Sequence, residues 1–278
     1  MKGVGKEIVK YLNDFQFGVG VSGGVEAVLH SANRVLSEHH ADGSLVMLTV
    51  DFLNAFNLVD RSALLHEVKK MCPSISLWVK FLYGQAARLY IGDQHIWSVT
   101  GVQQGDPLGP LLFALVLHPL VHKIRDNCKL LLHAWYLDDG TVIGDLEEVA
   151  RVLNIILLHG PGLGLGLNIK KMEIFWPSCD GKKLHADLFP TDIRRPSLGV
   201  KLLGGGGGAV NRDTGFISGL AMKRAVNDVD LMGLLPQLCD PQSELLLLRS
   251  CMGIAKLFFG LRTCQQVHIE EATLFFDK

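Results

Sequence analysis

Three aspartates stand next to apolar segments of strand length, and together they indicate metal-dependent chemistry. Asp51 directly follows the apolar run 44–50, and Asp138 and Asp139 separate the runs 130–136 and 141–144. Carboxylates held together in a half-buried place repel one another and raise one another's pKa unless a cation neutralises them. Such hard oxygen ligands suit Mg²⁺, which completes its shell with water and substrate phosphates. The acids therefore predict phosphoryl chemistry, in which two ions activate a hydroxyl and stabilise a leaving pyrophosphate.

Each of these acids also has a simpler explanation. Asp51 alone fits a turn acid at the end of a strand, and the pair Asp138 and Asp139 fits a solvated hairpin tip. Because apolar strands lead to both positions, the joint occurrence of the three acids favours the metal site over the separate explanations.

The elements that must position the acids can be predicted from hydrophobic spacing. The run 44–50 is continuously apolar, which is typical of a buried central strand. The runs 130–136 and 141–144 predict a hairpin with its turn over 137–140, since Asp139-Gly140 is a tight-turn signal. Helical spacing predicts helices at 24–36, 62–71, 76–83, 108–125 and 145–159. Asp145 and Glu148 are expected to form the N-cap and capping box of the last of these helices.

The remaining segments predict a second hairpin and a separate helical part. The runs 87–91 and 95–99 flank Gly92-Asp93, a turn pair, and the apolar end of 167–177 predicts another strand. Five consecutive glycines at 204–208 form the clearest flexible joint. Beyond them, periodicity predicts helices over 216–260, split by Pro236, with Asp240 as the N-cap of the last long one. We therefore expect a domain boundary near residue 204.

Composition limits the classes of function. The chain has 278 residues, of which 48% are hydrophobic and 20% charged, and this is enough for one large or two small globular domains. Its apolar stretches fall short of the roughly 20 residues that span a bilayer, and no secretion signal is visible. We therefore expect no membrane partner and an intracellular location, nuclear or cytoplasmic. A net charge of −1 disfavours a broadly basic face, and six cysteines without a CxxC pair disfavour zinc sites and disulfides.

Four ordered segments resemble the palm motifs of reverse transcriptases, most closely those of the non-LTR retroelement type. The segments are VDFLNAFN at 50–57, QQGDPLGPLLF at 103–113, YLDD at 136–139 and LNIKKME at 167–173. A tyrosine, any residue and two aspartates form a weak pattern alone. Four motifs in the family's order and spacing are specific, and the resemblance covers most of the chain.

By that resemblance, Asp51 and Asp138 hold the two metal ions, and Asp139 assists in the same acidic cluster. Lys171 matches the lysine that protonates the leaving pyrophosphate, a role that needs a cation beside a developing negative charge. The alternative for Lys171 is an ordinary surface lysine beside Lys170.

Three further residues match positions that contact the incoming nucleotide. Phe56 matches the ring that blocks a ribose 2′-hydroxyl and so favours deoxynucleotides. Gln104 and Gly105 match the loop that lies against the incoming nucleotide and the template. The alternatives are a core phenylalanine and a plain glycine turn that opens a helix at Asp106-Pro107.

The resemblance implies an α+β fold: a polymerase palm with an antiparallel sheet and packed helices, partial fingers and a partial helical thumb. Residues 1–43 would be residual fingers with a lead-in helix. Residues 44–203 would be the palm, with a fingers-like insertion at about 61–100, and residues 204–278 the partial thumb. The family's upstream fingers strands have no counterpart, so the chain resembles a reverse transcriptase domain truncated at the fingers.

The function implied is that of an RNA-directed DNA polymerase, a nucleotidyltransferase that adds deoxynucleotides to a primer 3′-hydroxyl. Its cofactor would be two Mg²⁺ ions, with Mn²⁺ as an alternative ion. Its partners would be an RNA template, a DNA primer and deoxynucleoside triphosphates. The missing fingers and the near-zero net charge favour an alternative: a catalytically inert retroelement remnant that acts only as a nucleic-acid-binding or scaffold module.

Two further patterns are weaker evidence for a binding site. His118 and His122 have the spacing of a zinc-binding pair on a helix, but no third ligand is evident, so metal binding there is disfavoured. Basic pairs at 182–183, 194–195 and 223–224 could meet the phosphates of a bound duplex, although such pairs are commonly solvated surface.

Overall fold

The computed structural model describes residues 4–12, 14–178, 188–203, 209–211, 214–252 and 255–277. Two compact units make up the chain. The first comprises Met1–Val28 and His39–Arg195, and the second comprises Leu29–Glu38 and Pro196–Lys278. The expected boundary near residue 204, the glycines 204–208 and the basic pair 182–183 lie outside the described residues.

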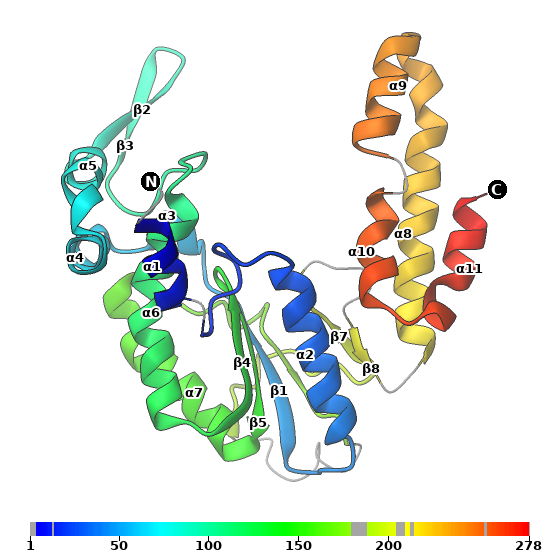
Figure 1. Ribbon diagram of the computed structural model, residues 1–278, viewed down its shortest axis with the longest axis horizontal. Helices are drawn as coiled ribbons and strands as arrows, with labels where there is room; N and C mark the ends of the chain where they lie inside the picture. The colour runs from blue at the N-terminus through cyan, green and yellow to red at the C-terminus, as the bar shows by residue number, and fades with distance from the viewer. Residues whose placement is uncertain are drawn as a thin grey trace. The chain divides into compact units, whose positions relative to one another are not determined.

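A four-stranded antiparallel sheet forms the centre of the first unit (Figure 1). Its order is β4-β5-β1-β6, with β1 at Leu45–Val50, β4 at Leu130–Tyr136, β5 at Asp139–Asp145 and β6 at Glu173–Phe175. In β1, Val50 pairs with Gly140 of β5, and Thr49 pairs with Glu173 of β6. The prediction of a buried central strand that ends at Asp51 is confirmed.

The turn between β4 and β5 differs from the prediction. A turn over 137–140 was expected from Asp139-Gly140, but Tyr136 pairs with Asp139, so only Leu137 and Asp138 form the turn. Leu137 has a φ of 57°, in the region that favours glycine. The buried side chain of Gln16 makes two hydrogen bonds to the Leu137 backbone at this turn, an interaction that the local sequence does not indicate. Asp139 is consequently the first residue of β5.

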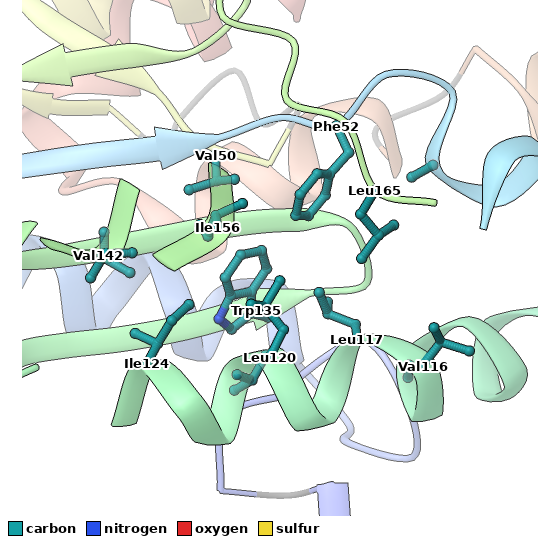
Figure 2. Close-up of a cluster of buried hydrophobic side chains, with 14 of the residues drawn as sticks. Val50, Phe52, Val116, Leu117, Leu120, Ile124, Trp135, Val142, Ile156 and Leu165 are labelled. Carbon is teal, nitrogen blue, oxygen red and sulfur yellow. The ribbon is translucent and has the colours of Figure 1, made fainter. Parts of the chain in front are cut away.

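Helices α6 (Gly109–Asn127) and α7 (Leu146–His159) pack against the sheet (Figure 1). Figure 2 shows their side chains meeting those of the strands around Trp135, whose side chain is fully buried. The side chains labelled there come from β1, β4, β5, both helices and the flanking loops: Val50, Phe52, Val116, Leu117, Leu120, Ile124, Trp135, Val142, Ile156 and Leu165. This core lies directly beneath the strand ends that carry the acids, so those ends are rigidly supported.

The first unit also contains further helices and a second hairpin. They are α1 (Val4–Leu12), α3 (Ala55–Leu58), α4 (Arg61–Met71), α5 (Pro73–Tyr83), β2 (Ala87–Ile91) and β3 (Gln94–Ser98). Helix α2 (Gly24–Glu38) begins at residue 24, as predicted, and its residues Leu29–Glu38 belong to the second unit. The β2–β3 hairpin extends away from the sheet (Figure 1), and Gly92, with a φ of 60°, lies in its predicted turn.

Three predicted helix starts need correction. Helix α5 begins at Pro73, three residues before the predicted start at 76. Asp145 does cap α7, because its carboxylate accepts the backbone N–H of Glu147 at 3.1 Å. Glu148 does not complete a capping box, because its carboxylate accepts the backbone N–H of Lys129 and pairs with Arg151. Helix α6 begins at Gly109 rather than at 108. The carboxylate of Asp106 accepts the backbone N–H of Leu108 at 2.8 Å, which forms a separate turn ahead of the helix.

The second unit is mainly helical, as the periodicity predicts. Its elements are β7 (Gly199–Lys201), β8 (Ala209–Asn211), α8 (Thr214–Leu234), a 3-10 helix (Leu235–Leu238), α9 (Pro241–Ser250), α10 (Ala255–Thr263) and α11 (Gln266–Phe276). Helix α8 packs against α11 through Ala225, Ile269 and Ala272. Pro236 lies in the 3-10 helix, and Asp240 caps α9, so both predictions are confirmed. None of the helices in the described ranges is long and apolar enough to cross a membrane.

Candidate active site

The strand pairing brings the three aspartates to one end of the sheet. Val50 lies opposite Gly140, so the next position in this antiparallel register sets Asp51 opposite Asp139. Residues opposite each other have Cα atoms about 5 Å apart and side chains on the same face. Asp138 lies in the adjoining turn. The fold therefore joins one acid with two others that lie almost ninety positions away in the sequence.

Burial and mutual repulsion raise the pKa of both carboxyls of the hairpin. For Asp138, burial is the largest cause of the raised pKa, and the charge of Asp51 adds to it. For Asp139, burial first, then Asp138 and then Asp51 raise the pKa to about 6. Asp139 as a whole residue is exposed, so water screens part of this effect. The predicted repulsion among the acids is confirmed in direction.

These acids fit a divalent cation but form only part of a ligand set. Atom Oδ1 of Asp51 is buried, and no hydrogen-bond partner for it exists in the described part of the chain. A bound cation would satisfy such an atom. Within the described ranges, no three histidine, cysteine, aspartate or glutamate side chains gather closely enough to hold a metal ion by themselves. Mg²⁺ in phosphate-transfer sites takes one or two carboxylates and fills its shell from substrate and water, which suits this partial set.

A loop that carries Lys171 runs beside Asp51. The backbone N–H of Asn168 donates to the carbonyl of Asp51 at 2.8 Å, and Leu53 donates to the carbonyl of Gly166 at the same distance. Lys171 follows in a turn, where its own backbone N–H donates to the carbonyl of Asn168. Its side chain is exposed and forms no ion pair within the described residues, so the loop brings Lys171 near the backbone of Asp51 without joining it to the acids.

Phe56 lies in α3, five positions past Asp51, and its ring packs on α6. The rings of Phe56 and Phe113 are stacked, with centroids 4.6 Å apart and an angle of 16° between planes. Phe56 is half-buried. The core-phenylalanine explanation therefore accounts for part of this side chain, and the rest of it is accessible to solvent.

Gln104 and Gly105 stand exposed in the loop before α6, with Gly105 at a φ of 90°. A Cβ at Gly105 would meet no atom within 4 Å, so the surroundings leave this backbone accessible. The position of both residues is set by their neighbours, since the backbone N–H of Gln103 donates to the Tyr83 hydroxyl at 3.3 Å.

Sequence reasoning missed the side chains that fix this loop. Arg61 is 7% exposed, and its guanidinium donates to the carbonyl of Gly101 at 2.9 Å and to the carbonyl and hydroxyl of Ser98, both at 2.8 Å. It lies over the ring of Tyr83, whose hydroxyl donates to Asp106. Burial, followed by the bond to Asp106, raises the pKa of Tyr83 to about 12. An arginine in the first turn of a helix gives no sequence signal of this role.

The histidine pair and the basic pair 194–195 each contact other residues of the first unit. The rings of His118 and His122 lie 4.1 Å apart, and the ring of Tyr11 packs on His118 at 4.4 Å. Burial lowers the pKa of His118 to about 4. Arg194 pairs with Glu173 at 3.7 Å, and Arg195 donates to backbone carbonyls of residues 189–191.

Comparison with known proteins bears on the identity of this site. A family model described as reverse transcriptase (RNA-dependent DNA polymerase) matches residues 5–205. The Trypanosoma brucei gambiense retrotransposable element SLACS 132 kDa protein is 31% identical over 176 residues, which are 61% of this chain and 14% of that protein. A putative 115 kDa protein in the Drosophila melanogaster type-1 retrotransposable element R1DM is 29% identical over 132 residues, which are 45% of this chain and 13% of that protein. The chain thus spans only a small part of these relatives.

Solved structures with some likeness include telomerases. Apo telomerase from Candida tropicalis aligns with a TM-score of 0.49 and 13% identity, covering 62% of this chain and 35% of that one. Telomerase from Candida albicans, in complex with a fragment of telomeric RNA, aligns with a TM-score of 0.46 and 13% identity, covering 75% of this chain and 37% of that one.

Proposed function

The chain belongs to the reverse transcriptase (RNA-dependent DNA polymerase) family, and from this premise we propose that it is the RNA-directed DNA polymerase domain of a non-LTR retroelement. In this proposal residues 44–203 form the palm, with a fingers-like insertion at about 61–100. Residues 1–43 belong to the fingers, and residues 204–278 begin a thumb. The partners are an RNA template, a DNA primer and deoxynucleoside triphosphates.

The observation that carries the proposal is the meeting of Asp51, Asp138 and Asp139 at one end of the sheet. These carboxylates would hold Mg²⁺, with Mn²⁺ as an alternative ion. When bound, the metal lowers the charge cost of the acids and stabilises the attacking and leaving oxygens. The unpartnered Asp51 oxygen and the mutual repulsion of the carboxyls support this assignment.

The remaining residues supply orientation and a proton. The primer 3′-hydroxyl would lose its proton to water as its oxygen bonds to the α-phosphorus and the bond to pyrophosphate breaks, and the ammonium of Lys171 would donate a proton to the leaving group. Gln104 and Gly105 would lie against the incoming nucleotide and the template. The exposed part of Phe56 would exclude a ribose 2′-hydroxyl, so Phe56→Ala is expected to increase ribonucleotide incorporation relative to deoxynucleotide incorporation.

Primer extension on an RNA template with a DNA primer and Mg²⁺ tests the proposal. We expect Asp138→Asn to lower extension by at least about a thousandfold, since an essential charge at the reacting centre is lost. Asp145→Asn, at the opposite end of β5, is the matched control, because asparagine caps a helix as well as aspartate does. Equal extension by the two variants would refute the role of Asp138.

One observation favours a second candidate, the nucleic-acid-binding or scaffold module without turnover. The described residues do not close a three-ligand metal site by themselves, and the net charge is only −1. Retained binding of a primer–template duplex, with no extension in Mg²⁺ or Mn²⁺ by the unaltered chain, would support this alternative over the polymerase.

A further inference from the structure

Gln16 is a buried polar residue whose side chain bonds both backbone groups of the residue that precedes the paired acids. It is 1% exposed and lies ahead of α2. Its Oε1 accepts the backbone N–H of Leu137 at 2.7 Å, and its Nε2 donates to the Leu137 carbonyl at 3.2 Å. The Gln16 carboxamide therefore makes the hydrogen bonds to the Leu137 backbone that a neighbouring strand would otherwise make.

The chain around Gln16 is fixed against the same hairpin. The backbone N–H of Phe17 donates to the carbonyl of Trp135, and Trp135 donates to the carbonyl of Phe15, both at 2.7 Å. Oε1 of Gln16 also accepts the backbone N–H of Gly18 at 3.0 Å. A Cβ at Gly18 would approach the Leu137 nitrogen to 2.8 Å, so only glycine allows this close packing. The orientation of the Gln16 amide is thus set from both sides.

The sequence of the turn itself does not favour the conformation that the turn adopts. A two-residue hairpin turn with positive φ at its first position normally carries glycine there. This turn carries leucine, with a φ of 57°, and the tighter Asp139-Gly140 turn signal lies two positions further on. Without an external partner, the local sequence favours moving the turn toward 139–140, which would take Asp139 out of β5 and away from its place opposite Asp51.

We propose that Gln16 is a positioning residue of the polymerase site: it holds Leu137 in the left-handed conformation and thereby sets Asp138 and Asp139 beside Asp51. This inference rests on the proposed function for its catalytic consequence. Its structural part, the choice of turn, stands independently of that function.

Amide hydrogen exchange tests the structural part without any metal or substrate. In the unaltered chain, the Leu137 N–H should exchange slowly. In Gln16→Leu, which keeps much of the side-chain volume, the rate should increase at least about tenfold, the factor expected for loss of a buried hydrogen bond. Gln85→Leu, at an exposed loop position, is the matched control and should leave the rate unchanged. Unchanged exchange in Gln16→Leu would overturn the proposal.

A rescue experiment tests the effect on the acids. Mn²⁺ binding, followed by paramagnetic broadening, and primer extension should both weaken about tenfold or more in Gln16→Leu. The double variant Gln16→Leu/Leu137→Gly should recover most of the loss, because glycine adopts a positive φ without help. A general loss of stability would not be repaired by an added glycine. Failure of this rescue while the variants remain folded would therefore overturn the positioning role.

The readouts separate this inference from the proposed function. If the unaltered chain neither binds Mn²⁺ nor extends a primer, the polymerase assignment fails, while the exchange rate of the Leu137 N–H still reports on Gln16. If the unaltered chain extends a primer and Gln16→Leu does so equally well, the polymerase assignment stands and the positioning role is refuted.

Discussion

The carboxyl of Asp139 illustrates how a site residue can lower the stability of the fold that holds it. Its pKa is raised from 3.8 to about 6, so the folded state binds this proton more tightly than the unfolded state does. The protonated Asp139 carboxyl therefore contributes stability below about pH 4, and this contribution is lost as the pH rises through 6. The full shift would correspond to about 3 kcal/mol, and screening by water at this exposed residue reduces it to about 1 kcal/mol.

We therefore expect Asp139→Asn to increase the free energy of unfolding by about 1 kcal/mol at pH 7 and to leave it unchanged near pH 4. Urea denaturation at the two pH values measures both quantities. Asp93→Asn, at the exposed tip of the β2–β3 hairpin, is the control for the substitution itself. An equal effect of Asp139→Asn at both pH values would contradict the raised pKa.

His118 gives the opposite pH dependence. It is 1% exposed, and burial followed by the nearby His122 lowers its pKa from 6.5 to about 4, so the fold keeps it neutral. The unfolded chain takes up the proton first, and stability is lost as the pH falls from about 6.5 to 4, by roughly 3 kcal/mol in total. In His118→Leu this part of the acid destabilisation should disappear from urea denaturation curves, whereas in His30→Leu, at an exposed position of α2, it should persist.

The buried side chain of Arg61 connects α4 to the loop before α6. Arg61→Lys should reduce the free energy of unfolding by about 2 kcal/mol, because a single ammonium cannot reach all the acceptors that the planar guanidinium serves. The loop 98–106 should also become more susceptible to proteolysis, and extension activity should fall with it. Arg34→Lys, in the exposed pair with Glu38, should leave the free energy of unfolding almost unchanged. Similar losses for the two variants would contradict the role assigned to Arg61.

Three glycines predict a graded response to alanine. At Gly101, φ is 73° and a Cβ would overlap the backbone of Asn57, so alanine should cost more than about 2 kcal/mol. At Gly92, φ is 60° with open space around it, and the cost should be about 1 kcal/mol. At Gly219, inside α8, alanine should instead stabilise by up to about 1 kcal/mol. Thermal unfolding of the three variants should give this order, and any other order would refute it.

Most elements could be predicted from the sequence because their signals are local. The apolar run of β1, the Gly92-Asp93 turn and the caps at Asp145 and Asp240 each depend on a few adjacent residues. Two of the errors, at Glu148 and in the β4–β5 turn, occurred where a distant side chain decides. Glu148 bonds Lys129 instead of its own helix start, and Gln16 holds the turn at Leu137 although Asp139-Gly140 is the stronger local signal.

The candidate site likewise combines residues that the sequence predicts with residues that it does not. The acids and their proximity follow from strand ends and motif order, and their mutual effect on pKa was predictable in direction. Arg61 and Tyr83, which fix the loop of Gln104, gave no signal, because a buried arginine in a first helical turn cannot be distinguished by sequence from a solvated one. Gln16 also gave no signal, because its amide bonds a residue 121 positions away in the sequence.

For the whole molecule, a group of exposed apolar side chains on α5 predicts how the chain behaves in solution. Leu77 is 82% exposed and Phe81 is 78% exposed; they are four positions apart on one helix face, and Trp78 beside them is more than half exposed. Contiguous apolar surface of this kind normally lies in an interface, whereas single exposed leucines are common. The free chain should therefore associate through α5 as its concentration rises.

Replacing this surface with charge should remove the association. The double variant Leu77→Glu/Phe81→Lys should sediment as a monomer over a concentration range in which the unaltered chain forms larger species. Its thermal midpoint should be almost unchanged, because neither side chain contributes to the core. Leu158→Lys on α7, which is 75% exposed, adds charge away from α5 and should leave the association as it was. If Leu158→Lys disperses the larger species equally well, the association does not depend specifically on the α5 face.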